Sequence, residues 1–291
     1  PIEGKLLGKQ VSYPQKYAPE ILVAVPRSIN REMYNLNDHA LPFIGVDVWH
    51  GWELSFLTQM GLPVAGVLKL VYPANSTFLV ESKSLKLYLN AFNMERYGSS
   101  PKEGIAEVLS VIKNDLSHLL NCEIQSSLFL NSPDVAPYDF GAFTLLEDKN
   151  LIETIDFTDF TEKPEILLSH STQKSGSMNV ATHLLRSNCK ITHQPDWGSA
   201  FIYIKSDHLP EETSLLKYLV SIRNENHFHE EICEMIYKRL FDIFTPDELM
   251  VTCIYTRRGG IDICPVRASH PHLIPDYLSN TDVLSRKLLR Q

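Results

Sequence analysis

The sequence predicts an α+β protein in which helices pack on one face of an antiparallel sheet, and it predicts this plan twice. In several short segments apolar and polar residues alternate, as in half-buried strands, while in others apolar residues recur at helical spacing. The segments follow the order strand–strand–helix–helix–strand–strand in both halves. A turn-rich stretch from residue 131 to about residue 177 separates them. Such an order is typical of helices covering one face of an antiparallel sheet.

The elements are expected at the following positions. In the first half the pattern predicts strands and helices over residues 43–57, 63–72, 84–93 (helix), 102–120 (helix) and 123–130. In the second half it predicts them over residues 184–193, 199–205, 211–224 (helix), 229–244 (helix), 249–256 and 261–266.

The two halves resemble each other at a constant offset. Residues 84–89 read Ser-Leu-Lys-Leu-Tyr-Leu and residues 214–219 read Ser-Leu-Leu-Lys-Tyr-Leu, an offset of 130 residues. Solenoid repeats run about 20–50 residues, so this spacing indicates duplicated domains. We predict an N-terminal half over residues 1–150 and a C-terminal half over residues 151–291.

The halves differ in their polar residues. Residues 81–83 read Glu-Ser-Lys, whereas the matching Glu212 and Thr213 are not followed by a lysine, and only the second half has a cysteine in its opening strand pair. This divergence predicts a division of labour, in which the first half binds an anionic group and the second carries the chemistry.

Composition and charge exclude several classes of protein. Of the 291 residues, 44% are hydrophobic and 21% are charged, which is typical of a globular chain and not of a disordered one. No apolar run reaches the ~20 residues of a membrane span. The net charge of −8 argues against nucleic acid as a partner. We therefore expect a small-molecule partner and neither nucleic acid nor membrane.

The cysteines and the first residues bear on location. The five cysteines are an odd number and form no Cys-x-x-Cys pair, and the chain starts without the basic-then-apolar layout of a signal peptide. Reduced thiols in the cytoplasm are the expectation. Four cysteines lie in apolar segments, as small core residues do, but Cys189 lies between Asn188 and Lys190.

Cys189 is the candidate nucleophile. A thiol becomes reactive where a cation or a hydrogen-bond donor favours the thiolate, and Lys190 and His193 are equal candidates for that role. Asp196 follows across a predicted turn, where its carboxyl group could return to the thiol as a proton donor. The simpler alternative is a structural cysteine beside a capping aspartate, and the local sequence does not separate the two.

His229 and Glu230 open the helix predicted from residue 229. Their side chains point about 100° apart, yet both can line a pocket at the helix start. A carboxylate pairs well with an amidine-like N–H edge such as that of guanine. The alternative is that Glu230 and Glu231 are first-turn acids favoured by the helix dipole.

A zinc site must also be weighed. Cys189 and His193 are four residues apart, as are His229 and Cys233, and together they offer four zinc ligands. On a strand the first pair would be ~13 Å apart, too far for one ion unless a turn intervenes. Cys233 also lies at a core-facing position, so we expect no metal.

Two cationic turns in an acidic chain favour a phosphorylated cofactor. Residues 81–86 begin a helix with a hydroxyl cap and with Lys83 and Lys86 in its first turn, where cations oppose the helix dipole. A phosphate bound at the helix start would offset that penalty. Residues 257–260 read Arg-Arg-Gly-Gly, and glycines let a ligand approach the backbone closely.

Taken together, these motifs closely resemble the NADPH-dependent 7-cyano-7-deazaguanine reductases (QueF) in their long, two-domain form. The Glu-Ser-Lys-Ser motif at residues 81–84 is the most specific of them, and the motif positions show no departure from the family pattern. The segments that carry the resemblance span nearly the whole chain, in family order, at residues 25–31, 81–90, 187–199, 228–230 and 255–260.

The resemblance implies two tandem tunnelling-fold domains, related in fold to GTP cyclohydrolase, and a place in queuosine biosynthesis, a tRNA modification pathway. The implied activity reduces the nitrile of 7-cyano-7-deazaguanine to a primary amine with two NADPH. Cys189 would attack the nitrile carbon to form a thioimide, and Asp196 would supply the proton. Because the imine formed on the way must be kept from water, the site should be closed. We expect a homodimer.

The resemblance also assigns the binding residues. Glu230 and His229 would hold the deazaguanine edge. Further substrate contacts are assigned to Val80, Glu81 and Ser82. NADPH contacts are assigned to Ser82, Lys83, Arg258 and Gly259.

Three alternatives are compatible with parts of this pattern. An amidinotransferase would use the same cysteine on the same nitrile but would need no cofactor phosphate site at Lys83 and Arg258. A purine or pterin binding module would need neither Cys189 nor Asp196. A zinc cyclohydrolase-like enzyme would need the metal quartet described above.

Overall fold

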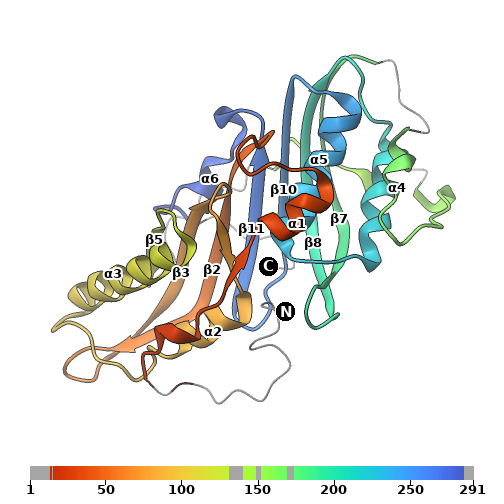
Figure 1. The fold of residues 1–291 in the computed structure, drawn as a ribbon. Helices are drawn as coiled ribbons and strands as arrows, with labels where there is room; N and C mark the ends of the chain where they lie inside the picture. Colours follow the sequence, from red (N-terminus) through yellow and green to blue (C-terminus); the bar gives the residue numbers. More distant parts are fainter. Residues whose placement is uncertain (1–13, 15, 131–139, 149–151, 169–173, 285–291) are drawn as a thin grey trace.

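The strands form one continuous sheet. The computed structural model describes residues 14, 16–130, 140–148, 152–168 and 174–284, and its class is α+β as predicted (Figure 1). In this part of the chain nine strands join in the order β5-β3-β2-β11-β10-β8-β7-β6, with β9 paired to β7. Neighbours are antiparallel except β6 and β9, which run parallel to β7. The strands are β2 (Ile44–Leu57), β3 (Pro63–Pro73), β5 (Gln125–Phe129), β6 (Thr144–Leu145), β7 (Gly176–Cys189), β8 (Pro195–Ser206), β9 (Asn226–His227), β10 (Glu248–Tyr255) and β11 (Ile261–Ala268).

A short N-terminal sheet and the helices complete the fold. β1 (Ala24–Pro26) pairs antiparallel with β4 (Phe78–Val80) apart from the main sheet. The α-helices are α1 (Ser28–Arg31), α2 (Ser82–Asn90), α3 (Pro101–Leu120), α4 (Glu212–Ser221), α5 (His229–Phe244) and α6 (Asp276–Ser279). In Figure 1, α2 and α3 lie against β2 and β3, and α4 and α5 lie against β7, β8 and β10.

The helices enclose a separate apolar core in each half. Leu85 and Val108, from α2 and α3, pack with Trp49 and Leu70 of the first half's strands. Leu215 and Ile236, from α4 and α5, pack in the same way with strand residues of the second half. The amphipathic helices therefore bury their apolar faces against one side of the sheet.

The opposite face of the sheet is covered by the chain's own later segments. Phe140 stacks on Phe201 of β8 with ring centroids 3.7 Å apart. Tyr277 and Leu278, in and near α6, pack on the same cluster as Val266 of β11. The sheet is therefore buried on both faces along its central strands.

The predicted boundaries match the structure at most elements. The helix expected over residues 229–244 is α5 with the same bounds. The strand expected over residues 184–193 is wrong: β7 runs from Gly176 to Cys189, and a turn follows. That turn is closed by the N–H of Cys189 donating to the carbonyl of Gln194 (2.8 Å), while His193 takes a positive φ of 55°.

The first half has two strands after its helices among the described residues, β5 and the two-residue β6. β6 pairs with β7 of the second half, and residues 131–139, which lie between β5 and β6, are outside the described residues. The last strand of the second half, β11, pairs with β2 and so joins the halves. The division at residue 150 stays a prediction, because residues 149–151 also lie outside this range.

The opening hairpins of the two halves bend at equivalent places. The register of β2 with β3 shifts between Gly51 and Leu54, and that of β7 with β8 shifts between Thr182 and Leu185. The shift in the second hairpin lies 131 residues after the shift in the first, at both of its ends. A β-bulge bends and twists its strand, so the two hairpins curve alike.

Lys69 holds the C-terminal segment on the sheet. This fully buried lysine of β3 donates from Nζ to the carbonyls of Tyr277 (3.1 Å), Asn280 (2.7 Å) and Val283 (2.7 Å). Three carbonyl partners replace the water that the ammonium group loses on burial.

We expect Lys69→Met to destabilise the protein by about 2–3 kcal/mol, because three carbonyls lose a charged donor. Urea unfolding measures the change. The control is Lys113→Met, which removes an exposed lysine 3.7 Å from Glu123 and should change stability by less than about 1 kcal/mol. Equal effects of the two substitutions would contradict the role of Lys69.

Candidate active site

One cavity collects residues from both halves of the chain. Its volume is about 280 Å³. Its walls come from the start of α2, the end of β7 and the following turn, the start of α5, and the turn between β10 and β11. Of the site residues predicted from sequence, those that line it are Val80, Ser82, Lys83, Cys189, Asp196, His229, Glu230, Arg258 and Gly259.

Cys189 is the last residue of β7 and is partly exposed at the cavity. The two side chains predicted to activate its thiol are engaged elsewhere. Lys190 Nζ lies 3.2 Å from Glu231 Oε1, and His193 Nδ1 lies 2.8 Å from Asn226 Oδ1. Neither is part of the cavity wall, so the groups available to exchange a proton with the thiol lie across the cavity.

Asp196, at the start of β8, is that nearby acid. It is 5% exposed and accepts a hydrogen bond from the guanidinium of Arg258, while His229 Nε2 lies 3.5 Å from its Oδ2. Burial alone would raise the pKa of Asp196, but His229 and Arg258 outweigh burial and hold that pKa below its ordinary value. These two partners therefore favour the carboxylate form of Asp196, which is suited to accept a proton.

The two acids in the first turn of α5, Glu230 and Glu231, have different surroundings. Glu231 accepts from the backbone N–H of Phe228 (3.1 Å) and from His227 Nδ1 (3.1 Å), and so satisfies the helix start. Glu230 faces the cavity instead. The ring of His229 packs against the ring of Tyr255, with the two ring centres 4.0 Å apart.

Glu230 is a buried carboxyl group with a free oxygen. It is 2% exposed, and its Oε1 has no hydrogen-bond partner. Burial and the nearby charge of Asp47 raise the pKa of Glu230 to about 8, while Arg27 and Arg267 act in the opposite direction. A buried acceptor without a partner is costly, so the position suits a ligand that brings N–H donors.

A buried ion network lies behind Glu230. Asp47 pairs with Arg27 (2.5 Å) and with Arg267 (2.8 Å). Glu234, one turn after Glu230 on α5, pairs with Arg267 (2.9 Å) and with Arg31 (2.7 Å). All five residues of the network are nearly inaccessible. The network ties residues 27 and 31 of the N-terminal segment to β2, β11 and α5.

The start of α2 differs from the prediction in its cap. The side chain of Glu81, not a hydroxyl group, accepts from the N–H groups of Lys83 (3.0 Å) and Ser84 (2.7 Å). Burial raises the pKa of Glu81 in spite of these two donors. Glu81 is not among the residues that line the cavity, so its predicted substrate contact stays a prediction.

The same cap corrects the alignment of the halves. Glu211, and not Glu212 as predicted, is the counterpart of Glu81, because its side chain accepts from Ser214 N (2.7 Å) at the start of α4. Thr213 still occupies the position that matches Lys83, so the difference in charge between the halves remains.

The two arginines of the turn between β10 and β11 have different positions. Arg257 lies outside the cavity with its guanidinium 3.6 Å from the ring centre of Trp52. Arg258 points into it. Gly259 has a φ of 58°. The turn lies so close to the first turns of α2 that a Cβ at this position would be 3.0 Å from Lys86 Nζ.

Several cavity residues were not predicted as site residues. Lys86, which the sequence places with Lys83 in a cationic first turn but to which the resemblance assigns no contact, also lines the cavity. Thr192 and Gln194, in the turn between Cys189 and Asp196, gave no signal of their own. The remaining unpredicted lining residues are Trp49, His227, Phe228, Thr256, Ile261, Asp262 and Ile263.

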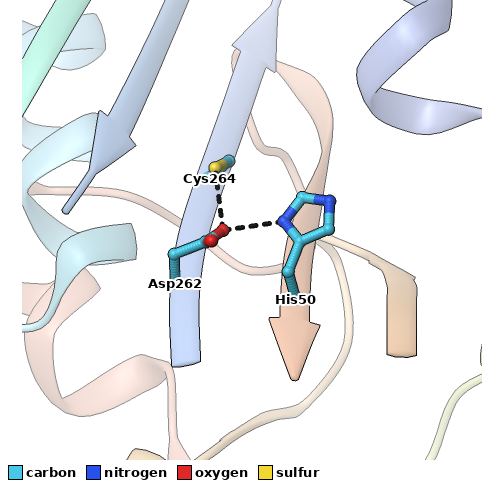
Figure 2. A group of neighbouring side chains, drawn as sticks. All are labelled: His50, Asp262 and Cys264. Atoms are coloured by element: carbon cyan, nitrogen blue, oxygen red, sulfur yellow. Dashed lines mark hydrogen bonds and ion pairs between the residues drawn. The ribbon is translucent and has the colours of Figure 1, made fainter. Parts of the chain in front are cut away.

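The structure does not assemble the four candidate zinc ligands. Cys233 is fully buried in the core of the second half and donates to the carbonyl of Val251 (3.4 Å). Among the described residues, a different group has ligand atoms within 4.8 Å of one another: His50, Asp262 and Cys264 (Figure 2).

The group in Figure 2 is held by hydrogen bonds. Oδ1 of Asp262 lies 2.7 Å from His50 Nδ1, and its Oδ2 accepts from Trp52 Nε1 at 2.6 Å. The thiol of Cys264 lies 3.7 Å from Oδ1. Both carboxylate oxygens are thus used within the protein, and the group fixes the register of β11 against β2.

These features define an α+β protein with an enzyme-like cavity, in which an accessible thiol, a paired aspartate, a buried glutamate and a cationic turn face one space. Within the described residues, no helix has both the length and the apolar character needed to cross a membrane.

Comparison with known proteins identifies the family. The sequence family described as "Nitrile reductase, 7-cyano-7-deazaguanine-reductase N-term" matches residues 13–128, and the family "QueF-like protein" matches residues 195–272. A Colwellia psychrerythraea protein is 41% identical over 276 residues, which cover 92% of this chain and 93% of that protein. A Psychrobacter arcticus protein is 38% identical over 283 residues, with coverage of 93% and 95%.

A Coxiella burnetii protein is 37% identical over 266 residues, with 91% of each chain covered. All three relatives are named NADPH-dependent 7-cyano-7-deazaguanine reductase. The chain belongs to the 7-cyano-7-deazaguanine reductase (QueF) family, which confirms the resemblance inferred from its motifs.

The raised pKa of Glu230 predicts a pH-dependent stability. A carboxyl group whose pKa is higher folded than unfolded leaves stability intact below pH 4.5 and removes it as the pH rises towards 8. Since one pKa unit corresponds to about 1.4 kcal/mol, Glu230→Gln should gain a few kcal/mol relative to the wild type between pH 5 and pH 9. Urea unfolding at both pH values measures this.

The control for this prediction is Glu123→Gln, at a surface carboxyl group that is 78% exposed. Its difference from the wild type should stay within about 0.5 kcal/mol at both pH values. A Glu230→Gln variant whose difference from the wild type does not change with pH would contradict the burial of an uncompensated carboxyl group.

Proposed function

We propose that this chain reduces the nitrile group of 7-cyano-7-deazaguanine to the aminomethyl group of 7-aminomethyl-7-deazaguanine, with NADPH as reductant, in queuosine biosynthesis. The observation that carries the proposal is that the unpartnered oxygen of buried Glu230 and the thiol of Cys189 line one cavity. Glu230 offers an acceptor to the N–H edge of a guanine-like ring, and Cys189 offers a nucleophile to the group that the ring carries.

The residues at the start of α5 bind the substrate in this proposal. A deazaguanine edge supplies N–H donors that suit the unpartnered carboxylate oxygen of Glu230, and that pairing favours its ionised form against the effect of burial. His229 is the neighbouring polar ring on the same wall, and Val80 and Ser82 close the cavity from the first half. The orientation of the ring would then fix which atoms reach Cys189.

Covalent capture uses Cys189 and Asp196. The sulfur forms a bond to the nitrile carbon as the C≡N triple bond becomes C=N. The thiol proton passes to the carboxylate of Asp196, which delivers it to the nitrile nitrogen and completes a thioimide. Asp196 is suited to this step, because its low pKa keeps it ready to accept a proton.

Reduction to the amine takes up four electrons, that is two hydrides, and two protons. NADPH supplies one hydride each time it is bound, so two molecules are consumed. After the first hydride and proton, the C–S bond breaks, Cys189 recovers its thiol and an imine remains. After the second hydride and proton, the imine is a primary amine. The imine must be kept from water between the two steps, so the cavity would have to close over the bound substrate and cofactor.

The residues at the cavity mouth fit a phosphorylated cofactor. Lys83, Lys86 and Arg258 place three cationic side chains on the wall, and Gly259 leaves its backbone open to close approach. Ser82 adds a hydroxyl group at the helix start. We assign the NADPH contacts to Ser82, Lys83, Arg258 and Gly259.

Two features of the assembly belong to the same proposal. We infer that the halves are tandem tunnelling-fold units, supported by their equivalent bulges and by the matching caps Glu81 and Glu211. We infer a homodimer, because the sheet ends among the described residues at the open edges of β5 and β6. We infer a cytoplasmic location from the free thiols of the five cysteines.

Intact mass tests the nucleophile. Incubation with 7-cyano-7-deazaguanine and no NADPH should add the mass of one substrate to the wild type and nothing to Cys189→Ala. The matched control is Cys122→Ala, which removes a partly buried thiol that does not line the cavity and should keep the adduct. An adduct that survives Cys189→Ala would overturn the assignment.

Steady-state kinetics test the cofactor contact. Lys83→Ala should raise KM for NADPH about tenfold or more, because a charged partner of a phosphate is lost, and should leave KM for the nitrile nearly unchanged. Lys102→Ala, at the exposed first turn of α3, is the control and should change neither constant. A larger effect on the nitrile than on NADPH would contradict the assignment.

A further inference from the structure

Arg258 is bound to the residue that the proposed chemistry needs to be free. Its guanidinium donates to Asp196 Oδ1, to Gln194 Oε1 (2.5 Å) and to Thr192 Oγ1 (3.4 Å), all on the β7–β8 turn or the start of β8. The proposed function gives Asp196 a proton-transfer role and Arg258 a cofactor phosphate. These three bonds use donors on both Nη atoms of the guanidinium, so a phosphate bound through the same two atoms competes with Asp196 for Arg258.

The two partners differ in their freedom to move. The side chain of Asp196 is 5% exposed, whereas that of Arg258 is 40% exposed at the cavity mouth. Arg258 can return to solvent at little cost because it is already partly exposed, whereas the buried carboxyl group of Asp196 that it leaves keeps only His229 as a partner and favours uptake of a proton. The arginine is therefore the partner that can leave, towards the wall that carries Lys83 and Lys86.

We propose that Arg258 is a positioning residue that exchanges between Asp196 and the phosphate of the bound cofactor, so that cofactor binding releases Asp196 as a proton donor. This inference rests on the proposed function. With Arg258 in place, Asp196 is an ionised acceptor, which suits capture of the thiol proton. With Arg258 withdrawn, Asp196 takes up a proton readily, which suits the two protonations that accompany reduction.

The groups that face Asp196 account for this change. His229 faces it from α5, Arg258 from the β10–β11 turn, and Arg186 and Cys189 lie on neighbouring β7. Burial favours the neutral acid, while His229 and Arg258 favour the carboxylate. Withdrawal of one of the two opposing partners, together with the arrival of phosphate charge, shifts the balance towards the neutral acid.

The test measures binding of NADP+, which cannot donate hydride, by calorimetry at pH 8 without the nitrile. Asp196→Asn should bind NADP+ about tenfold more tightly than the wild type, because an amide holds the guanidinium less strongly. Arg258→Gln should bind more weakly. In the Arg258→Gln background, Asp196→Asn should bring no gain, since the gain acts through Arg258.

Arg257 supplies the matched control, because it is the adjacent arginine but stacks on Trp52 and does not contact Asp196. In the Arg257→Gln background the gain from Asp196→Asn should persist. A second readout is proton uptake on NADP+ binding near pH 6, from titrations in two buffers of different ionisation enthalpy. The wild type should take up protons, and Asp196→Asn should not.

Each outcome is decisive. Equal affinities of Asp196→Asn and the wild type, or a gain that persists without Arg258, would overturn the exchange. Adduct formation at Cys189 tests the proposed function separately. If the adduct forms but the coupling is missing, the exchange alone fails, whereas a missing adduct overturns the proposed chemistry itself.

Discussion

The ion network of Asp47, Glu234 and their arginine partners is the constraint on which the site depends. Arg267 bridges the two acids, Arg27 pairs with Asp47, and Arg31 pairs with Glu234. Removing one member would leave a buried charge without its partner, at a cost of about 3–5 kcal/mol. The network therefore holds the N-terminal segment, β2, β11 and α5 in one arrangement, and α5 begins with the residues that form the cavity wall.

The network also explains how one helix supplies two different carboxyl groups. Glu230 and Glu234 are four residues apart on α5, so they share a face. Burial would raise the pKa of both, but Arg267 and Arg31 lower that of Glu234, whereas burial and Asp47 leave Glu230 with a pKa of about 8. Arg31 and Arg267 pair with Glu234, whereas Oε1 of Glu230 has no hydrogen-bond partner and is left for a ligand.

What the sequence could predict follows from the range of each interaction. Local periodicity located α5 to the residue, and the resemblance assigned Cys189, Asp196 and Glu230 to one site, which agrees with the single cavity that they line. The network could not be predicted, because Arg31 and Glu234 are 203 residues apart and, although Arg31 lies in a motif of the resemblance, nothing in the sequence pairs it with Glu234. The cap at Glu81 was missed for another reason. Serine and glutamate both accept from a helix start, and only the geometry shows which of them does.

The two halves use an equivalent turn in different ways. At the offset of the bulges, Thr58 is the counterpart of Cys189, and each residue closes its hairpin, with Thr58 N donating to Leu62 (2.9 Å) and Cys189 N donating to Gln194 (2.8 Å). The hydroxyl group of Thr58 is used inside its own turn, where it accepts from Leu62 N at 3.1 Å. The second turn is one residue longer, and its Gln194 reaches Arg258 while the thiol faces the cavity. One fold position thus serves stability in the first half. In the second, the added residue leaves the same position available for chemistry.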